Sequence, residues 1–163
     1  MAFTSGNDVN ILQASDSSVV GAGAGNDKYI LAANQLGAGQ TITLSDAQGS
    51  NTLQLIGGLT ITSSLVANNV AQLTLSNGAV VNINGANNFS YEIGGDPLTG
   101  VAGVVQNYST FATTTLGAAS VPPAGSAPVP GTPNTTINPT PASAYTLTAS
   151  PTFVAEGSTA TFT

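Results

Sequence analysis

The 163-residue chain contains no histidine, no cysteine and no tryptophan. Without histidine it lacks the commonest general base and metal ligand, and without cysteine it lacks thiolate nucleophiles, disulfides and iron–sulfur ligands. Its seven acidic residues are scattered along the sequence rather than paired as an acid/base dyad. The composition therefore predicts that the protein is not an enzyme.

Basic charge is nearly absent, because Lys28 stands alone against seven acidic residues and the formal net charge is −6. A protein with one cation cannot neutralise a row of phosphates, so we expect no nucleic-acid partner and no docking on anionic lipid. Divalent cations suit this charge balance. Charged residues make up only 5% of the chain, against about 25% in an average globular protein. A surface solvated by Asn, Gln, Ser and Thr is typical of rigid extracellular β-proteins.

Long hydrophobic runs are missing too. No stretch approaches the ~20 consecutive apolar residues of a membrane-spanning helix, so we expect no membrane span. The first ten residues, MAFTSGNDVN, contain neither a basic leader nor the apolar segment of a cleavable signal peptide. A surface-like composition without such a signal implies cytosolic residence, removal of the leader, or export by a route that reads another part of the protein.

Residues 1 to about 94 consist of short β-like runs separated by turns rich in Gly, Asn, Asp and Ser. The runs show the period-2 alternation of half-buried strands. They are TITL (41–44), TLQLI (52–56), LTIT (59–62), AQLTL (71–75) and AVVNI (79–83). Ser76-Asn77-Gly78 predicts a hairpin, because Asn-Gly supplies the positive φ of a type I′ turn. This zone is predicted to be all-β, either a β-roll or solenoid-like stack or a β-sandwich.

A single short capping helix is predicted to follow over about residues 97–112 and to cover one end or face of the sheet. Its apolar residues recur at intervals of three and four, as on one face of a helix. They are Leu98, Val101, Val104, Val105, Tyr108 and Phe111. Asp96 is a suitable N-cap, and Pro97 fits the first helical position. Residues 1–117 are therefore predicted to form one β-domain with a C-terminal helix.

The composition changes again at residues 118–144, which carry seven of the nine prolines among Gly, Ser, Thr and Ala. This stretch predicts an extended, semi-rigid linker. Residues 145–163 return to a strand pattern, but two strands cannot form a domain alone. They predict either the start of a second β-domain or strands exchanged with another copy of the chain. Head-to-tail exchange of that kind produces a filament.

The stretch GAGAGNDKYIL (21–31) contains the principal candidate site. Gly23, Gly25, Asp27 and Tyr29 occupy the second Gly, third Gly, Asp and large apolar positions of the nonapeptide G-G-x-G-x-D-x-U-x, in which Ala22 replaces the first Gly. Residues 22–30 therefore resemble one repeat of the repeats-in-toxin (RTX) calcium-binding β-roll. The resemblance implies that glycine carbonyls and the aspartate carboxylate hold Ca²⁺, a cation that takes six to eight oxygen ligands.

A second, poorer match lies upstream, where Gly6 and Asp8 fit the pattern but Asn10 occupies the apolar position. A third echo, Gly49-Ser50-Asn51, has lost its aspartate. RTX calcium lies between turns 18 residues apart, whereas Asp8 and Asp27 are 19 apart. The resemblance implies a calcium site formed by Asp27, Asn26, Gly25, Gly23, Asp8 and Gly6. The residues alone also leave open plain β-turns, in which the Asn and Asp side chains cap their own backbone.

The tail, YTLTASPTFVAEGSTATFT, resembles the opening of a Calx-beta or immunoglobulin-like repeat of large bacterial surface proteins. In those repeats a strand is followed by V-x-E-G and a second strand, and Val154, Glu156 and Gly157 occupy these positions. A calcium-binding role for Glu156 is one implication, and a turn glutamate in solvent is the other.

Both resemblances imply the N-terminal region of a large, secreted, modular surface protein that uses type I secretion. We expect an extracellular structural protein or adhesin that assembles with copies of itself into a filament or surface layer and is stabilised by calcium. The alternative is a carbohydrate-binding or accessory module of a secreted polysaccharide-active protein, with surface glycans as partners. Glu92 and Asp96 make a poor glycosidase pair, because Asp96 is better placed as a helix cap.

Overall fold

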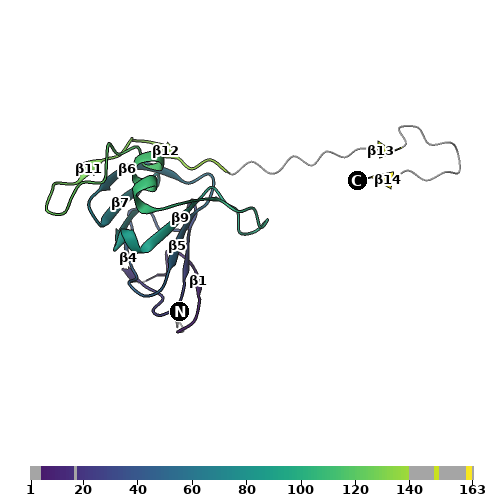
Figure 1. The fold of residues 1–163 in the computed structure, drawn as a ribbon, viewed down its shortest axis with the longest axis horizontal. Helices are drawn as coiled ribbons and strands as arrows, with labels where there is room; N and C mark the ends of the chain where they lie inside the picture. Colours follow the sequence, from purple (N-terminus) through teal and green to yellow (C-terminus); the bar gives the residue numbers. More distant parts are fainter. Residues whose placement is uncertain (1–4, 17, 140–148, 151–160, 163) are drawn as a thin grey trace, which may run out of the picture.

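The computed structural model describes residues 5–16, 18–139, 149–150 and 161–162, and it shows a mainly β protein with one short helix (Figure 1). Sheet A contains β1 (Val9–Ile11), β3 (Lys28–Leu31), β5 (Asn51–Leu55), β9 (Phe89–Ile93) and β10 (Val104–Gln106), in that spatial order. Sheet B contains β2 (Val19–Val20), β4 (Thr41–Ser45), β6 (Thr60–Val66), β7 (Val70–Leu75), β8 (Val80–Asn84), β11 (Val129–Pro130) and β12 (Thr135–Thr136). A short 3₁₀ turn, η1 (Ala86–Asn88), precedes β9.

The chain passes back and forth between the two sheets. It runs from β1 in sheet A to β2 in sheet B, returns for β3, crosses to β4, returns for β5, and reaches β9 after the β6–β7–β8 meander. Strands far apart in sequence thereby become parallel neighbours: Val9 pairs with Lys28, Lys28 with Thr52, and Thr52 with Ser90. In sheet B, β4 pairs in parallel with both β2 and β8. The prediction of an all-β fold class is confirmed, and the strands form two mixed sheets.

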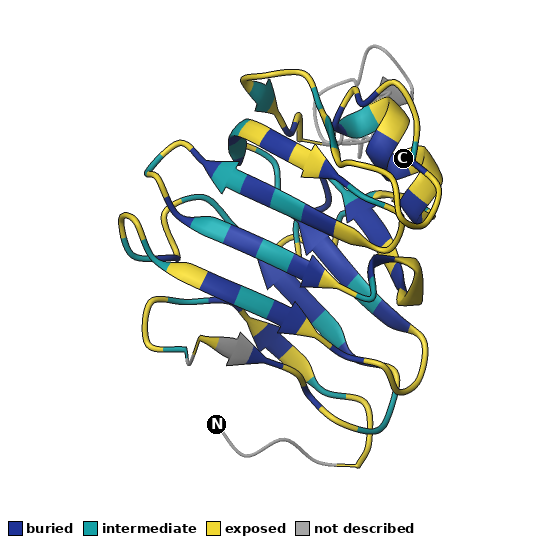
Figure 2. Ribbon diagram, turned by 90° about the vertical axis from the view of Figure 1, so that its left-hand side faces the viewer, coloured by how far each residue is buried: buried dark blue, intermediate teal, exposed yellow. Residues whose placement is uncertain are grey.

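The core lies between the inner faces of the two sheets, because alternate residues of each strand point inwards. Figure 2 shows this alternation of buried and more exposed residues along the strands. In sheet A the register places Tyr29, Leu53 and Tyr91 side by side, and all three are fully buried. Removing apolar surface from water is worth about 25 cal/mol per Å², so this inner row contributes strongly to the stability of the fold.

The hairpin predicted at Ser76-Asn77-Gly78 joins β7 to β8, which pair antiparallel. Its turn is not the expected type I′, because only Gly78 has a positive φ (82°) and Asn77 does not. Asn77 instead acts through its side chain. Its Nδ2 donates to Leu36 O at 2.8 Å, and its Oδ1 accepts from Ala79 N at 3.1 Å. The asparagine thus ties the hairpin turn to a neighbouring loop.

The helix is shorter and begins later than predicted. Residues expected as its first half form a loop and then β10, which pairs antiparallel with β9. Only α1 (Tyr108–Thr110) and its π-helical continuation η2 (Phe111–Thr115) are helical. Leu98 is 95% exposed, so its spacing does not mark a buried helical face. The helix does cover the core, because the rings of Phe111 and Tyr91 stack with centroids 4.1 Å apart.

The proline-rich stretch predicted as a linker (118–144) packs onto the domain in its described part. Val129 of β11 pairs with Val66, and Thr135 of β12 pairs with Ile61, so both short strands lie along β6. Ile137 is buried in the core. Proline is tolerated here because the outer side of an edge strand needs no N–H donor. Residues 118–139 therefore close one edge of sheet B, and residues 140–144 lie outside the described residues.

Of the segment predicted as a second β-domain or exchanged strands (145–163), the described residues are β13 (Ala149–Ser150) and β14 (Thr161–Phe162). These two short strands pair antiparallel with each other. Val154, Glu156 and Gly157 lie outside the described residues. The second domain and the strand exchange stay predictions.

The packing of the proline-rich segment can be tested with Ile137→Ala. Deleting this buried side chain should lower the free energy of unfolding by about 2–4 kcal/mol, since it leaves a cavity. Urea unfolding of the full chain, followed by circular dichroism, measures the change. Leu98→Ala is the control, because truncating an exposed side chain should change stability by no more than about 0.5 kcal/mol. An unchanged midpoint for Ile137→Ala would show that the segment does not pack as described.

Candidate functional site

Three turns of the chain stack at the starts of β1, β3 and β5. They contain Gly6-Asn7-Asp8, Gly25-Asn26-Asp27 and Gly49-Ser50-Asn51. The parallel register continues into these turns, since Lys28 N donates to Asp8 O at 2.9 Å and Thr52 N donates to Asp27 O at 2.8 Å. The structure therefore brings the three motifs side by side, although the spacings of 19 and 24 residues follow no fixed repeat. We call this arrangement the turn stack.

Neighbouring turns approach so closely that only glycine fits between them. A Cβ atom added to Gly25 would lie 2.3 Å from Gly6 O, and one added to Gly49 would lie 1.6 Å from Gly25 O. Both glycines also have a positive φ, 118° and 78°, which side chains disfavour. Gly23, also at positive φ (96°), lies exposed in the loop after β2. Close backbone contact between neighbouring turns thus explains why Gly25 and Gly49 have to be glycine.

Side chains in the stack form hydrogen bonds with the backbone of the adjacent turn. Asn7 Oδ1 accepts from Asn26 N at 2.8 Å, and Asn26 Oδ1 accepts from Ser50 N at 2.8 Å. In the opposite direction, Asn51 Oδ1 accepts from Asp27 N at 3.0 Å, and Asp27 Oδ1 accepts from Asp8 N at 2.8 Å. The sequence predicted calcium ligands and left open caps on their own backbone. Asn51 does cap its own turn, since its Nδ2 donates to Gln48 O at 3.0 Å, whereas the four bonds above connect one turn to the next.

The oxygen atoms of the stack bear directly on the predicted calcium site. The side-chain oxygens of Asn7, Asn26 and Asn51 and one oxygen of Asp27 already accept backbone N–H groups. The other oxygen, Asp27 Oδ2, is buried and has no hydrogen-bond partner in the described structure. Within the described ranges, no group of three or more His, Cys, Asp or Glu side chains is placed to hold a metal ion. A cation here would depend on amide, carbonyl and water oxygens besides the carboxylates of Asp8 and Asp27.

Asp46 does not join the stack but binds Tyr29 from the other sheet. Its buried carboxylate accepts hydrogen bonds from the Tyr29 hydroxyl and, at 3.2 Å, from Gln48 N. Burial and then the bond to Asp46 raise the pKa of Tyr29 well above its ordinary value, so the phenol remains a donor. No pattern in the sequence indicates this pair, because Tyr29 occupies a position expected to be purely apolar.

The single lysine belongs to a polar group on the outer face of sheet A. Lys28 Nζ lies 2.7 Å from Glu92 Oε2, and Glu92 Oε1 accepts from Gly103 N at 2.9 Å and Gln54 Nε2 at 3.2 Å. Partial burial alone would raise the pKa of Glu92, but the bonds from Gly103 and Lys28 outweigh it and hold the pKa below its ordinary value. Sequence reasoning missed this group, because its members come from three strands and a loop.

Asp96, the other carboxylate of the rejected glycosidase pair, closes a turn rather than a helix. Its oxygens accept from Leu98 N at 2.8 Å and from Thr99 Oγ1 at 2.9 Å, and these bonds lower its pKa. Glu92 and Asp96 both line a hollow of about 210 Å³ beside Lys28. Their oxygens are occupied by structural partners, which does not favour acid/base chemistry.

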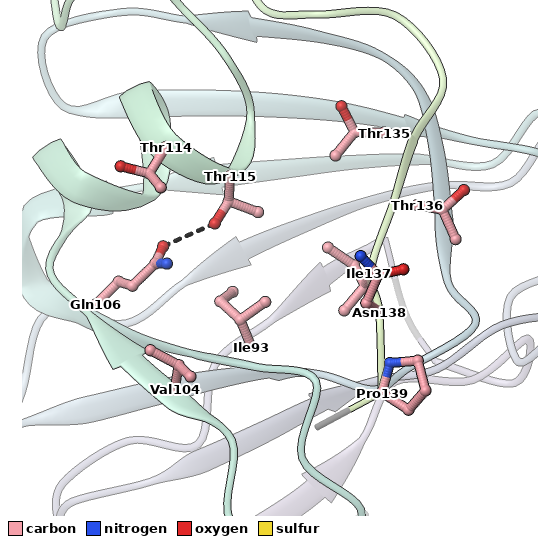
Figure 3. A pocket seen from close by; sticks show the side chains of 10 residues that line it. All are labelled: Ile93, Val104, Gln106, Thr114, Thr115, Thr135, Thr136, Ile137, Asn138 and Pro139. Carbon is pink, nitrogen blue, oxygen red and sulfur yellow. Dashed lines mark hydrogen bonds between the residues drawn. The ribbon is translucent and has the colours of Figure 1, made fainter. Parts of the chain in front are cut away.

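A larger hollow, of about 400 Å³, lies between β10, the helix and residues 135–139 (Figure 3). Ile93 and Val104 form its apolar part, and Thr115 Oγ1 donates to Gln106 Oε1 at 2.8 Å on its polar side. None of the residues that line it is ionisable. It offers a binding surface without an acid, a base or a strong metal ligand.

The contact between turns is testable with Gly49→Ala, for which Gly39→Ala is the matched control. Gly39 has a similar φ (69°) but open space around it, so its substitution should cost only the left-handed conformation, about 1–2 kcal/mol. Gly49→Ala should cost about 1–3 kcal/mol more, because the new methyl group overpacks the stack. Urea unfolding gives both values. Equal losses would show that the turns are not in contact.

The Lys28–Glu92 pair predicts a component of stability that depends on pH. Because the folded state lowers the pKa of Glu92, its contribution is present above the ordinary glutamate pKa and is lost as pH falls through the folded value. Unfolding midpoints between about pH 6 and pH 3 should therefore fall less for Glu92→Gln than for the unsubstituted chain. Asp16→Asn is the control carboxylate. Parallel pH profiles for Glu92→Gln and the parent would contradict the role of the pair.

Comparison of this chain with protein-family models, curated proteins and solved structures found no match. No helix in the described part of the chain is long and apolar enough to cross a membrane. The function therefore has to be inferred from the turn stack and the surfaces around it.

Proposed function

We propose that the protein is an extracellular structural or adhesive module of the RTX-like β-roll type, exported by a type I route, which assembles with copies of itself into a filament or surface layer. The turn stack is the observation that carries this proposal, because Gly25 and Gly49 contact the preceding turn through their backbones and side chains bond from turn to turn. Stacked passes of this kind contact chiefly their neighbours and extend along one axis. They supply rigidity and regular surfaces.

The edges of the two sheets support self-assembly. Among the described residues, β1 and β2 each end a sheet and have no further partner strand. On β1, Val9 and Ile11 are 64% and 49% exposed. Unpaired backbone groups beside exposed apolar side chains form a template to which another strand can be added. The β1 edge of sheet A, which we call the N-terminal edge, is therefore the proposed contact between copies.

The use of the carboxylates supports a non-enzymatic role. Glu92 pairs with Lys28, Asp46 with Tyr29, and Asp96 with the backbone of its own turn. General acid/base catalysis needs a carboxylate within reach of a substrate proton, usually in a cleft and with a tuned pKa. These three carboxylates are engaged in contacts that stabilise the fold. Calcium belongs to the proposal as a stabiliser, since Asp27 and Asp46 are buried negative groups without a basic partner in the described structure.

Carbohydrate binding is a second candidate, favoured by the outer face of sheet B. The register forms two rows of mostly hydroxyl and amide side chains across the sheet. The rows are Thr41, Val80, Thr74 and Ser63, and Thr43, Asn82, Gln72 and Leu65. A hollow of about 520 Å³ is lined by members of both rows and by Pro130 and Pro133. Neutral sugars suit such groups, but the rows contain no aromatic ring for stacking, which places this function second.

Assembly is tested with the full chain at rising concentration in millimolar calcium, by light scattering and negative-stain electron microscopy. We expect ordered filaments or layers. The double substitution Val9→Lys and Ile11→Lys should keep the chain monomeric, because charges on an edge strand block strand addition. Leu98→Lys is the control, because Leu98 is also apolar and is even more exposed but lies outside that edge, and this variant should still assemble.

Two outcomes would contradict the assembly proposal. One is a monodisperse monomer at every concentration, and the other is assembly that the edge substitutions leave unchanged. A glycan array with the same preparations separates the second candidate, because specific sugar binding by a monomer favours the carbohydrate-binding module.

A further inference from the structure

The inner row of the four parallel strands of sheet A contains one residue that breaks its pattern. The register aligns Asn10 with Tyr29, Leu53 and Tyr91, so a polar amide in β1 occupies the position that is aromatic or aliphatic in β3, β5 and β9. Asn10 is only 2% exposed, yet neither its Oδ1 nor its Nδ2 has a hydrogen-bond partner in the described structure. A buried amide without partners is costly, and such departures from the local pattern concentrate at functional sites.

The second orphaned polar group, Asp27, is a neighbour of Asn10. Backbone bonds extend the ladder to Asp8 and Asp27, so these residues precede Asn10 and Tyr29 by two positions and share their inner face. Asn10 and Asp27 are therefore diagonal neighbours on adjacent strands, within reach of each other's side chains. Asp27 is also 2% exposed, and its Oδ2 has no partner. Two polar groups with unsatisfied atoms thus lie on the same inner face of adjacent strands.

The charge around these two groups is not balanced. Asp46 is buried nearby, since its carboxylate accepts a hydrogen bond from the hydroxyl of Tyr29, the residue two positions after Asp27. Lys28, the only basic residue of the chain, bonds to Glu92 on the outer face of the same sheet. Burying a carboxylate is expensive unless a positive charge compensates it. A water molecule would supply a hydrogen bond but no charge.

We propose that a divalent cation of the calcium class binds on the inner side of the first two passes of the chain, with Asp27 Oδ2 and Asn10 Oδ1 as its protein ligands and Asp46 as a nearby negative charge. The proposal rests on the calcium part of the proposed function and moves the ion from the turn stack, where the side-chain oxygens of Asn7, Asn26 and Asn51 already accept hydrogen bonds, to the inner row. Oxygen-only ligands select hard cations. With so few carboxylates, the expected dissociation constant is about 10⁻⁴–10⁻³ M, as in extracellular modules.

The test measures cation-dependent stability and terbium binding on the full chain. The thermal midpoint should rise with calcium relative to EGTA, and Tb³⁺ should show luminescence sensitised by tyrosine that calcium displaces. Asn10→Leu should abolish both effects while leaving the midpoint in EGTA equal to or above that of the parent, because it completes the apolar inner row. Asp27→Asn removes the charge with little change in shape and should weaken terbium binding at least tenfold, which keeps the test decisive if Asn10→Leu folds poorly.

Asn26→Ala is the matched control, because Asn26 belongs to the turn stack and its side chain bonds only to Ser50 N in the described contacts. It should lower the midpoint in EGTA but keep the calcium shift and the terbium signal. Loss of the shift in Asn26→Ala with retention in Asn10→Leu would overturn the inner site and place the ion in the turn stack. Superimposable melts of the parent in calcium and EGTA would overturn both calcium proposals, whereas the assembly proposal is tested separately by microscopy.

Discussion

The contact between Gly25 O and the backbone of Gly49 sets the geometry on which the rest of the fold depends. Because no side chain separates the turns, the strands that follow them start at the same level and pair without a shift. That alignment puts Tyr29 beside Leu53 in the interior and Lys28 within reach of Glu92 on the outside. A methyl group at Gly49 would act on the turn and, through the register, on both faces of sheet A.

The same constraint allows the successive passes of the chain, from one turn of the stack to the next, to differ in length. Only the turn and the strand after it have to align, so the segment that crosses to sheet B and returns is free to vary. Asp8 and Asp27 are 19 residues apart, and Asp27 and Asn51 are 24 apart. The next pass takes in the β6–β7–β8 meander before it reaches Phe89, which pairs with Asn51. A fixed sequence period is therefore not a requirement for stacked turns.

The sequence predicted those features that arise from neighbouring residues. Period-2 alternation predicted the strands, and Asn77-Gly78 predicted the hairpin between β7 and β8. Prediction from the sequence failed where contacts between distant residues decide the structure. The spacing of Leu98 and Val104 predicted a buried helical face, but both side chains are exposed. The prolines predicted a linker, but the segment contains two short strands that pair with β6. At the candidate site, Asp27 and Asp8 were predicted together, but Asn51, Asp46 and the orphaned Asn10 became meaningful only through the register.

The two proposals meet at the N-terminal edge, since Asn10 lies between Val9 and Ile11 on β1. Its side chain points into the core, where the cation is proposed, while Val9 and Ile11 are exposed at the edge proposed to contact another copy. A cation that holds the inner side of β1 would fix the strand whose outer side takes part in assembly. Thermodynamic linkage makes the effect reciprocal. The factor by which calcium raises the affinity between copies is also the factor by which assembly raises the affinity for calcium. An extracellular calcium concentration near the dissociation constant would make β1 an assembly switch, because the cation that compensates the buried carboxylate is available outside the cell and scarce within it.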